Sequence, residues 1–260
     1  MRGRSDVSEA LLLRSVDYRD ADRIVTLLTA RHGKLAFIAR GARRSKKRFG
    51  GALQPFAVLG VEVTLRGSQL GTLLRAEVSR AFPTLLGDLD RLAVGYAMLE
   101  LLAELSPERQ ADAGIFALAL EALAALDAAE LSPLPLLLAF ELRLVALAGF
   151  APNLQSCGGC GKRPGPEQAA LFDPRRGHLV CRDCGGARER LSARARGALG
   201  AALAQDWKPL LLADWAGPGE LTSLRQAIER FVEHRIGKSL KSLPWSPSEA
   251  QANEEPCDEG

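Results

Sequence analysis

Short hydrophobic runs separated by turn residues dominate the first eighty positions of the chain. The runs are rich in Val, Ile, Leu, Thr and Phe, and Gly, Asp and Arg recur between them, which is the pattern of short β-strands joined by turns. The runs predict strands over 10–15, 23–29, 34–40, 56–65 and 72–78. An open sheet of this size would leave its edges and one face uncovered. We therefore predict a five-stranded OB-type β-barrel over residues 1–80.

After Phe82 the hydrophobic spacing becomes helical and the composition shifts to Ala, Leu and Glu. The pattern predicts helices over 89–102, 115–126 and 136–148, helical structure again from Leu191, and a last helix over 220–241. A segment rich in Gly, Pro and Cys interrupts this pattern. We expect an α+β multidomain chain with a helical domain in two parts (81–148 and 187–244), an inserted cysteine module (149–186) and a disordered acidic tail (245–260).

The 260 residues are 47% hydrophobic and 25% charged, which is enough to bury a core and too apolar for a disordered chain. No uncharged apolar run of about 18 residues is present. The nearest candidate, Leu131 to Phe150, contains Pro133, Pro135, Glu141 and Arg143. The charged N-terminus does not resemble a secretion signal, so we expect a cytoplasmic protein that does not bind membranes.

Four cysteines form the most specific motif in the chain. Cys157 and Cys160 are separated by two residues, as are Cys181 and Cys184, and 20 residues lie between the pairs. Each pair can wrap one edge of a tetrahedral ion, so the spacing predicts a structural zinc site. A hairpin is expected between the pairs, with strands at 170–172 and 178–180. Such a ribbon has almost no core and depends on its metal.

Two disulfides, an iron centre on the same thiolates, and cysteines without a metal are the alternatives to zinc. Disulfides are disfavoured in a cytosolic protein. Four protein ligands leave no open position on the metal for a substrate, so catalysis there is not expected. We interpret His178, beside the second cysteine pair, as a surface residue.

Charge is distributed unevenly along the chain. Residues 1–80 carry a net charge of +9, residues 81–150 carry −7 and residues 151–196 carry +5. The basic excess at the front gathers in one acid-free run, Arg31, Lys34, Arg40, Arg43, Arg44, Lys46, Lys47 and Arg48. A strand and loop of this charge can track a phosphate backbone. The alternative is a solvated loop without a partner.

Aromatic residues near this run could stack on bases. Phe37 and Phe56 lie in hydrophobic strand patterns and are better explained as core, so Phe49 is the preferred candidate. Cations also lie along the last predicted helix. Cations near the C-terminus of a helix complement its dipole, and this structural role is favoured over partner binding.

Signatures of enzymes are largely absent. Gly237-Lys238-Ser239 resembles the end of a P-loop, but the required earlier glycine is Val232. His32, His178 and His234 stand in no motif with a nucleophile. We expect a protein that is not an enzyme.

Four stretches together resemble the RecO family of bacterial DNA repair and recombination mediator proteins. They are Gly33 to Arg44 with Leu53-Gln54-Pro55-Phe56, Leu70-Gly71-Thr72-Leu73, Ala148 to Leu154 before Cys157 to Gly161, and Arg235 to Ser242. Each stretch is short, but their order and spacing make chance agreement improbable. The acidic tail and the Ala/Leu-rich middle depart from the family pattern.

The resemblance implies an OB domain followed by a helical domain with an inserted zinc module. It also implies binding of single- and double-stranded DNA, annealing of complementary strands without ATP, and replacement of single-strand-binding protein by a RecA-type recombinase at the nucleoid. The implied partners are RecR and the acidic C-terminal tail of the single-strand-binding protein.

The family's basic OB surface maps onto Lys34, Arg40, Arg43, Arg44, Lys46, Lys47 and Arg48. We expect the acidic C-terminal tail of the single-strand-binding protein to bind near Arg225, Arg235 and Lys238. An OB-fold RNA-binding or ribosome-associated factor, and a zinc-ribbon enzyme subunit or scaffold, remain as alternative functions.

Overall fold

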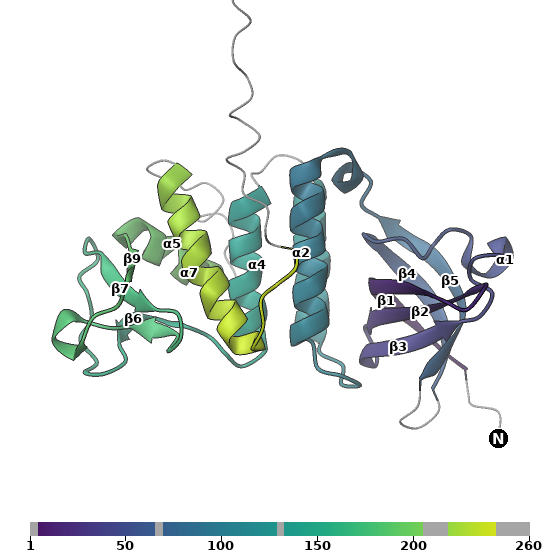
Figure 1. Ribbon diagram of the computed structural model, residues 1–260, viewed down its shortest axis with the longest axis horizontal. Coiled ribbons are helices and arrows are strands. Elements are labelled where there is room, and N and C mark those ends of the chain that lie inside the picture. Colours follow the sequence, from purple (N-terminus) through teal and green to yellow (C-terminus); the bar gives the residue numbers. More distant parts are fainter. Residues whose placement is uncertain (1–4, 66–69, 129–132, 205–217, 243–260) are drawn as a thin grey trace, which may run out of the picture.

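Three structural units lie side by side in the computed structural model, which describes residues 5–65, 70–128, 133–204 and 218–242. A β-barrel occupies one end, a layer of helices the middle, and a small β-module the other end (Figure 1). The predicted acidic tail at 245–260 lies outside the described residues.

The barrel has five strands, as predicted. They are β1 (Ser5–Tyr18), β2 (Asp22–Thr29), β3 (Gly33–Ala39), β4 (Ala57–Thr64) and β5 (Gly71–Ala81). Their order around the closed barrel is β1-β2-β3-β5-β4, and only the β3–β5 pair among these strands is parallel. This connectivity is that of an OB-fold. The close approach of β5 to β3 needs a glycine, because a Cβ on Gly71 would lie 2.5 Å from the Phe37 ring.

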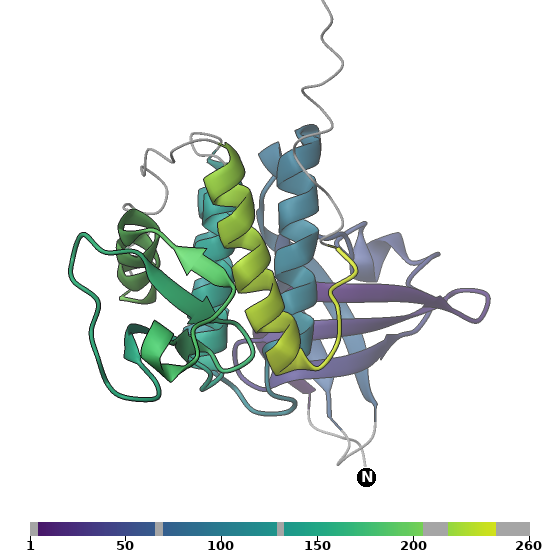
Figure 2. The same cartoon turned by 60° about the vertical axis from the view of Figure 1, so that its left-hand side comes forward.

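Strand β1 is longer than predicted. The sequence pattern marks only 10–15 because the buried apolar run is Ala10 to Leu13, whereas Ser5 to Glu9 are mostly exposed and Arg14 to Tyr18 are all exposed. This part of β1 still pairs with β2, where Tyr18 lies opposite Asp22. The resulting hairpin projects from the barrel as the purple hairpin in Figure 2.

The helical layer contains five described α-helices and one described 3-10 turn. Their bounds are η1 (Thr84–Gly87), α2 (Leu89–Leu105), α3 (Ala113–Asp127), α4 (Pro133–Leu147), α5 (Ala193–Leu203) and α7 (Pro218–Ile236). The side chains of Asp88, Asp112 and Ser192 accept backbone N–H bonds at the first turns of α2, α3 and α5. Such caps stabilise helix starts by about 1 kcal/mol each.

Helix α4 is the centre of this layer and packs against α2, α3, α5 and α7. Its apolar side chains from Leu134 to Val145 are buried all round, which explains the long apolar stretch in the sequence. Burial of each leucine contributes roughly 1.5–3 kcal/mol. Among the described helices, none is long and apolar enough to cross a membrane.

Two predicted helix boundaries were wrong. Leu191 does not begin a helix, because it ends strand β9 (Glu189–Leu191). Helix α7 ends at Ile236 and not at Lys241, since Gly237 adopts φ +77° and its N–H donates to the carbonyl of Glu233. A glycine in this conformation closes a helix, so the P-loop-like glycine serves as a helix cap.

The small module contains β6 (Asn153–Cys157), β7 (Ala170–Asp173), β8 (His178–Leu179), η2 (Arg182–Cys184) and β9. The sheet order is β6-β8-β7-β9, so the module extends beyond the predicted boundary at residue 186 to Leu191. The predicted hairpin is confirmed as β7–β8, and the Asp173 carboxylate accepts two N–H bonds in its turn.

One apolar core joins the three units. It includes Leu11 and Phe56 from the barrel, the inner faces of all five described α-helices of the layer, and Phe172 and Leu179 from the module. A second cluster fills the interior of the barrel. At the module end, the rings of Phe172 and Phe231 pack edge to face with centroids 6.0 Å apart. The units therefore form one packed body.

A buried carboxyl group lies at the centre of this body. Glu141 on α4 is 1% exposed, and its Oε2 atom has no hydrogen-bond partner among the described residues. Burial raises the pKa of Glu141 to about 8, with nearby Glu229 adding to the effect and Arg225 opposing it. The folded chain therefore keeps a proton that the unfolded chain, with an ordinary glutamate pKa of 4.5, releases at much lower pH.

We predict that Glu141→Gln makes unfolding less dependent on pH. Because the folded pKa of Glu141 is raised, its contribution to stability is present below about pH 4.5 and is lost as the pH rises to about 8. The slope is at most roughly 1.4 kcal/mol per pH unit. Urea unfolding from pH 5 to 9 should show the variant gaining stability over wild type as the pH rises. The exposed Glu108→Gln serves as control, and parallel curves for wild type and Glu141→Gln would contradict this account.

Candidate functional site

The four predicted cysteines meet at one end of the module. Their sulfur atoms all lie within 4.8 Å of one another, and the Sγ atoms of Cys160 and Cys181 are 3.7 Å apart. Glycines with positive φ shape both turns, Gly161 in the first and Gly185 in the second. All four side chains are free thiols, so the disulfide alternative is wrong for this structure.

The cluster has the dimensions of a tetrahedral metal site. Metal–sulfur bonds of about 2.3 Å place tetrahedral sulfur atoms about 3.8 Å apart, close to the observed 3.7 Å. The N–H groups of Gly159 and Cys181 point to the Cys157 sulfur at 3.4 and 3.3 Å. Such bonds favour a thiolate there, which is the form that binds metal.

The four thiols cannot all ionise without a cation. Backbone N–H bonds, first that of Cys181, lower the pKa of Cys157 to about 6. Hydrogen bonds with the neighbouring cysteines, first Cys181, raise the pKa of Cys184 to about 12. A divalent ion that bound all four thiolates would remove this conflict. Such an ion would have no position left for a substrate, so it would serve structure and not catalysis.

His178 is half-buried against the first cysteine turn rather than on the surface. Its Nδ1 atom lies 2.9 Å from the carbonyl oxygen of Leu179. A Cβ on Gly158 would lie 2.4 Å from the imidazole ring, so the glycine is needed for this contact. The imidazole thus packs beside the cluster without belonging to it.

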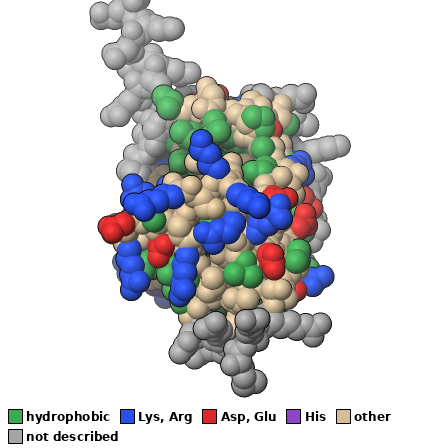
Figure 3. Space-filling view, turned by 90° about the vertical axis from the view of Figure 1, so that its right-hand side faces the viewer, with side chains coloured by type: hydrophobic (Ala, Val, Ile, Leu, Met, Phe, Trp, Pro, Cys, Tyr) green, Lys and Arg blue, Asp and Glu red, His purple; other side chains and the backbone are tan. Residues whose placement is uncertain are grey.

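The basic loop, defined here as residues 40–48, follows β3 and includes most of the short helix α1 (Lys46–Phe49) on the outer face of the barrel (Figure 1). Its six cations, none of them buried, are Arg40, Arg43, Arg44, Lys46, Lys47 and Arg48. Figure 3 shows lysine and arginine side chains gathered across this end of the molecule. The structure therefore brings six of the seven predicted DNA-binding residues together.

Local contacts fix the loop in place. The Gly41 N–H donates to the Asp22 carboxylate at 2.7 Å, and the Arg43 N–H donates to the Ala21 carbonyl at 3.1 Å. The Arg48 guanidinium donates to the Arg40 carbonyl at 2.7 Å. In contrast, the side chains of Arg40, Arg44, Lys46 and Lys47 form no ion pair with a described residue. These four cations are available to a polyanion.

Lys34 lies apart from this surface, contrary to the prediction that groups it with the loop cations. Its ammonium group donates to the Ala103 carbonyl on α2, and its backbone pairs with the segment around Glu108. Lys34 lies at the start of strand β3, whereas the basic loop follows the end of that strand. It therefore anchors the barrel to the helices.

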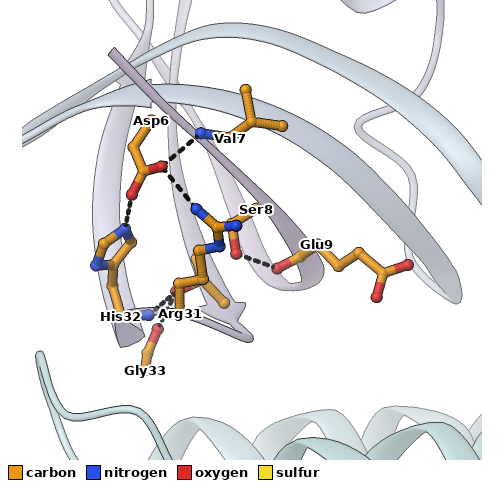
Figure 4. Close-up of polar contacts among 8 residues, drawn as sticks. Asp6, Val7, Ser8, Glu9, Arg31, His32 and Gly33 are labelled. Carbon is orange, nitrogen blue, oxygen red and sulfur yellow. Dashed lines mark hydrogen bonds and ion pairs between the residues drawn. The ribbon is translucent and has the colours of Figure 1, made fainter. Parts of the chain in front are cut away.

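Arg31 and His32 are also held away from the loop. Both contact the Asp6 carboxylate on β1, Arg31 at 3.2 Å and His32 through Nε2 at 2.7 Å (Figure 4). The hydrogen bond from His32 is the main cause that lowers the pKa of Asp6. The first residues of the basic run therefore join the β2–β3 turn to β1 through Asp6.

The aromatic prediction was wrong for Phe49. Helix α1 turns its ring into the barrel, where it is 2% exposed, while Arg48 lies over it at 5.2 Å. Phe37 and Phe56 are buried, which confirms the core interpretation. Tyr18 is a further aromatic residue near the basic loop. It is 37% exposed beside Arg19, and the Arg43 guanidinium donates to the Asp20 carbonyl in the same β1–β2 turn. In the sequence, Tyr18 directly precedes the polar residues Arg19 and Asp20, a pattern typical of a turn.

The three predicted partner-binding residues do not form one surface. Arg225 is half-buried, and its positive charge opposes the rise in the pKa of the buried Glu141. Lys238 pairs with Glu104 on α2 at 2.7 Å. Arg235 lies over the Phe231 ring and lines a cavity of about 410 Å³ together with Leu147 and Phe150.

Comparisons with known proteins cover nearly the whole chain. A family model described as Recombination protein O N terminal matches residues 4–82, and one described as Recombination protein O C terminal matches residues 86–244. The chain is similar to a DNA repair protein RecO from Anaeromyxobacter dehalogenans (strain 2CP-C), with 42% identity over 88% of this chain and 91% of the relative.

Similar proteins from more distant sources share this description. A DNA repair protein RecO from Myxococcus xanthus (strain DK1622) is 39% identical over 91% of this chain and 95% of its own length. One from Nocardioides sp. (strain ATCC BAA-499 / JS614) is 33% identical over 91% of this chain and 97% of its own length.

We predict that the module loses its metal and its order when Cys160 and Cys184 are both replaced by Ser. A two-ligand site cannot hold the ion against buffer, and the small sheet has little core of its own. Elemental analysis should find one metal ion per wild-type chain and none in the variant. Hydrogen exchange should become fast in β7 and β8 while the barrel strands stay protected.

Cys257→Ser is the matched control, because this fifth cysteine stands outside the motif. It should leave the metal content unchanged. A wild-type protein purified without metal, or a double variant with normal protection of β7 and β8, would contradict the structural role.

Proposed function

Because the chain belongs to the RecO family of DNA repair proteins, we propose that it binds single- and double-stranded DNA through the basic loop and anneals complementary strands without ATP. In this proposal it helps a RecA-type recombinase to replace single-strand-binding protein, with RecR as a partner, at the nucleoid. The observation that carries the proposal is the set of cations on the outer face of an OB barrel that form no ion pair with a described residue.

The proposed mechanism is electrostatic. Each phosphate that a cation neutralises releases condensed counterions into solution. Two strands held in this way repel each other less, so base pairing can nucleate between them. Tyr18 on the neighbouring hairpin offers a ring for stacking on a base, which contributes about 1–3 kcal/mol. No covalent step is required.

Zinc is the metal proposed for the cysteine cluster. Four thiolates in a tetrahedral arrangement are a common structural zinc site, although a single iron would fit similar distances. The metal would hold the two cysteine turns together and so keep the module folded beside α7 and α5. Its identity follows from the same elemental analysis as its stoichiometry.

The acidic tail of single-strand-binding protein is proposed to dock in the cavity beside Arg235. That cavity has apolar walls from Leu105, Leu147 and Phe150, and the Arg235 guanidinium supplies a positive charge. Two carboxylates also line it, but Asp112 caps helix α3 and Glu104 pairs with Lys238. An acidic peptide with an apolar end matches this combination. Of the three residues predicted from the sequence, Arg225, Arg235 and Lys238, the proposal keeps only Arg235 as a contact for the tail.

For DNA binding, we predict that replacing Arg40, Arg44, Lys46 and Lys47 by Ala weakens affinity for any sequence. Loss of up to four phosphate contacts should make the slope of log K against log salt less steep, by up to about 3.6 on duplex DNA and about 2.8 on single strands. Fluorescence anisotropy with labelled single strands and duplexes across a salt series measures both quantities.

A charge-matched control compares two pairs of exposed lysines. Lys46→Ala with Lys47→Ala should reduce affinity, whereas Lys238→Ala with Lys241→Ala on the helical side should not. Equal effects of the two pairs would mean that only net charge matters and would argue against a binding loop.

For the acidic tail, we predict that Arg235→Ala weakens binding of a synthetic tail peptide by about tenfold, corresponding to about 1.4 kcal/mol. Arg225→Ala should leave peptide affinity unchanged, because that side chain acts on Glu141 instead. Isothermal titration calorimetry distinguishes these results. Unchanged affinity in Arg235→Ala would remove the peptide from this cavity.

A further inference from the structure

A second basic site lies in the cysteine module. A cavity of about 520 Å³ opens between the two cysteine turns and strand β9. Four cations from three separate segments line it, namely Lys162, Arg163, Arg182 and Arg190. No aspartate or glutamate among the described residues lines it.

The wall of this cavity is held in a defined position. The Arg196 guanidinium on α5 donates to the carbonyl oxygens of Gly165, Pro166 and Gln168 at 2.6, 3.4 and 3.2 Å. The Gly165 N–H donates to the Gln168 side chain at 3.0 Å. These bonds fix the loop that carries Lys162 and Arg163, so the cations are presented on a rigid frame.

The positive charge is only partly offset by neighbours. Lys162 lies 3.6 Å from the exposed Asp183, but Arg163, Arg182 and Arg190 form no ion pair with a described residue. A larger cavity between the module and α7 differs, because Asp173, Glu189 and Glu233 line it together with its cations. Of these two cavities, the one at the cysteine turns therefore has the excess of cations.

The lining favours a polyanion over an acidic peptide with an apolar anchor. Ala170, Leu179 and Val180 line the cavity but are less than a tenth exposed, and its other apolar side chains, Pro164, Ala169 and Leu171, are only partly exposed. No aromatic residue of the described chain lines the cavity, so bases have no ring to stack on. The available chemistry is recognition of repeated negative charge, as in a phosphodiester backbone.

We propose that this cavity binds the backbone of a second DNA segment, independent of sequence. The module and the basic loop lie at opposite ends of the molecule (Figure 1), and the shared core fixes their separation. One chain could therefore hold two DNA segments at once. This inference rests on the proposed DNA binding by the basic loop.

The main competing explanation is that these cations balance the thiolates of the cysteine cluster, since Cys157 and Cys181 also line the cavity. A dication with four thiolates retains a formal charge of −2. In that case, removal of the cations would weaken metal binding and leave the DNA stoichiometry unchanged. The metal content of every variant must therefore be measured beside its DNA binding.

The test counts short oligothymidylates bound per chain by native mass spectrometry at low salt. Wild type should bind two. Arg163→Gln with Arg182→Gln and Arg190→Gln should bind one and keep its metal, and the variant lacking the four free cations of the basic loop should also bind one. Arg190→Gln alone, on β9 and away from the cysteine turns, should weaken the second binding step if the triple variant loses metal.

Arg175→Gln with Arg176→Gln is the charge control, because these exposed arginines lie in the β7–β8 turn outside the cavity. Two oligonucleotides bound to a metal-loaded triple variant, or a single one bound to wild type, would overturn the inference. Displacement of the second oligonucleotide by polyglutamate at equal charge concentration would assign the cavity to acidic peptides instead. If wild type binds none, the proposed function itself fails.

Discussion

A single apolar core, centred on helix α4, fixes the three units of this protein relative to one another. Helix α4 packs against four other helices, and through them the core reaches Leu11 and Phe56 in the barrel and Phe172 in the module. Lys34 adds a polar tie between β3 and α2. Because the units are packed together, the basic surfaces of the barrel and the module have a fixed separation. Any polyanion that binds both must span that separation.

The uneven charge along the sequence follows from this arrangement. The acidic middle segment supplies the helical layer, where many carboxylates are used within the chain. Asp88 and Asp112 cap helices, Glu104 pairs with Lys238, and the Glu100 carboxylate accepts the N–H groups of Lys241 and Ser242. The basic segments instead form the two ends of the molecule, where several cations form no ion pair with a described residue. The middle segment thus serves mainly to join the ends.

The sequence allowed the barrel, most helices and the cysteine cluster to be predicted, because each depends on local spacing. Alternation marks strands, a period of about 3.6 marks helices, and paired cysteines mark a tetrahedral ion. The errors about the site arose where tertiary position decides. Lys34 and Arg40 are close in sequence, but they lie at opposite ends of a strand about 20 Å long. Phe49 points inward because α1 folds onto the barrel, and the charge of Arg225 opposes the rise in the pKa of the buried Glu141. Closeness in sequence does not show where a side chain lies or which way it points in the folded chain.

The central claim is that the basic loop brings DNA strands together. Its most direct test is the rate at which two complementary DNA strands anneal without ATP, first bare and then coated with the cognate single-strand-binding protein. The account predicts that the wild-type protein accelerates annealing on both substrates. It also predicts that replacing Arg40, Arg44, Lys46 and Lys47 by Ala removes the acceleration while the protein stays folded. Annealing that is equally fast with the substituted protein, or that the wild type does not accelerate, would contradict the account.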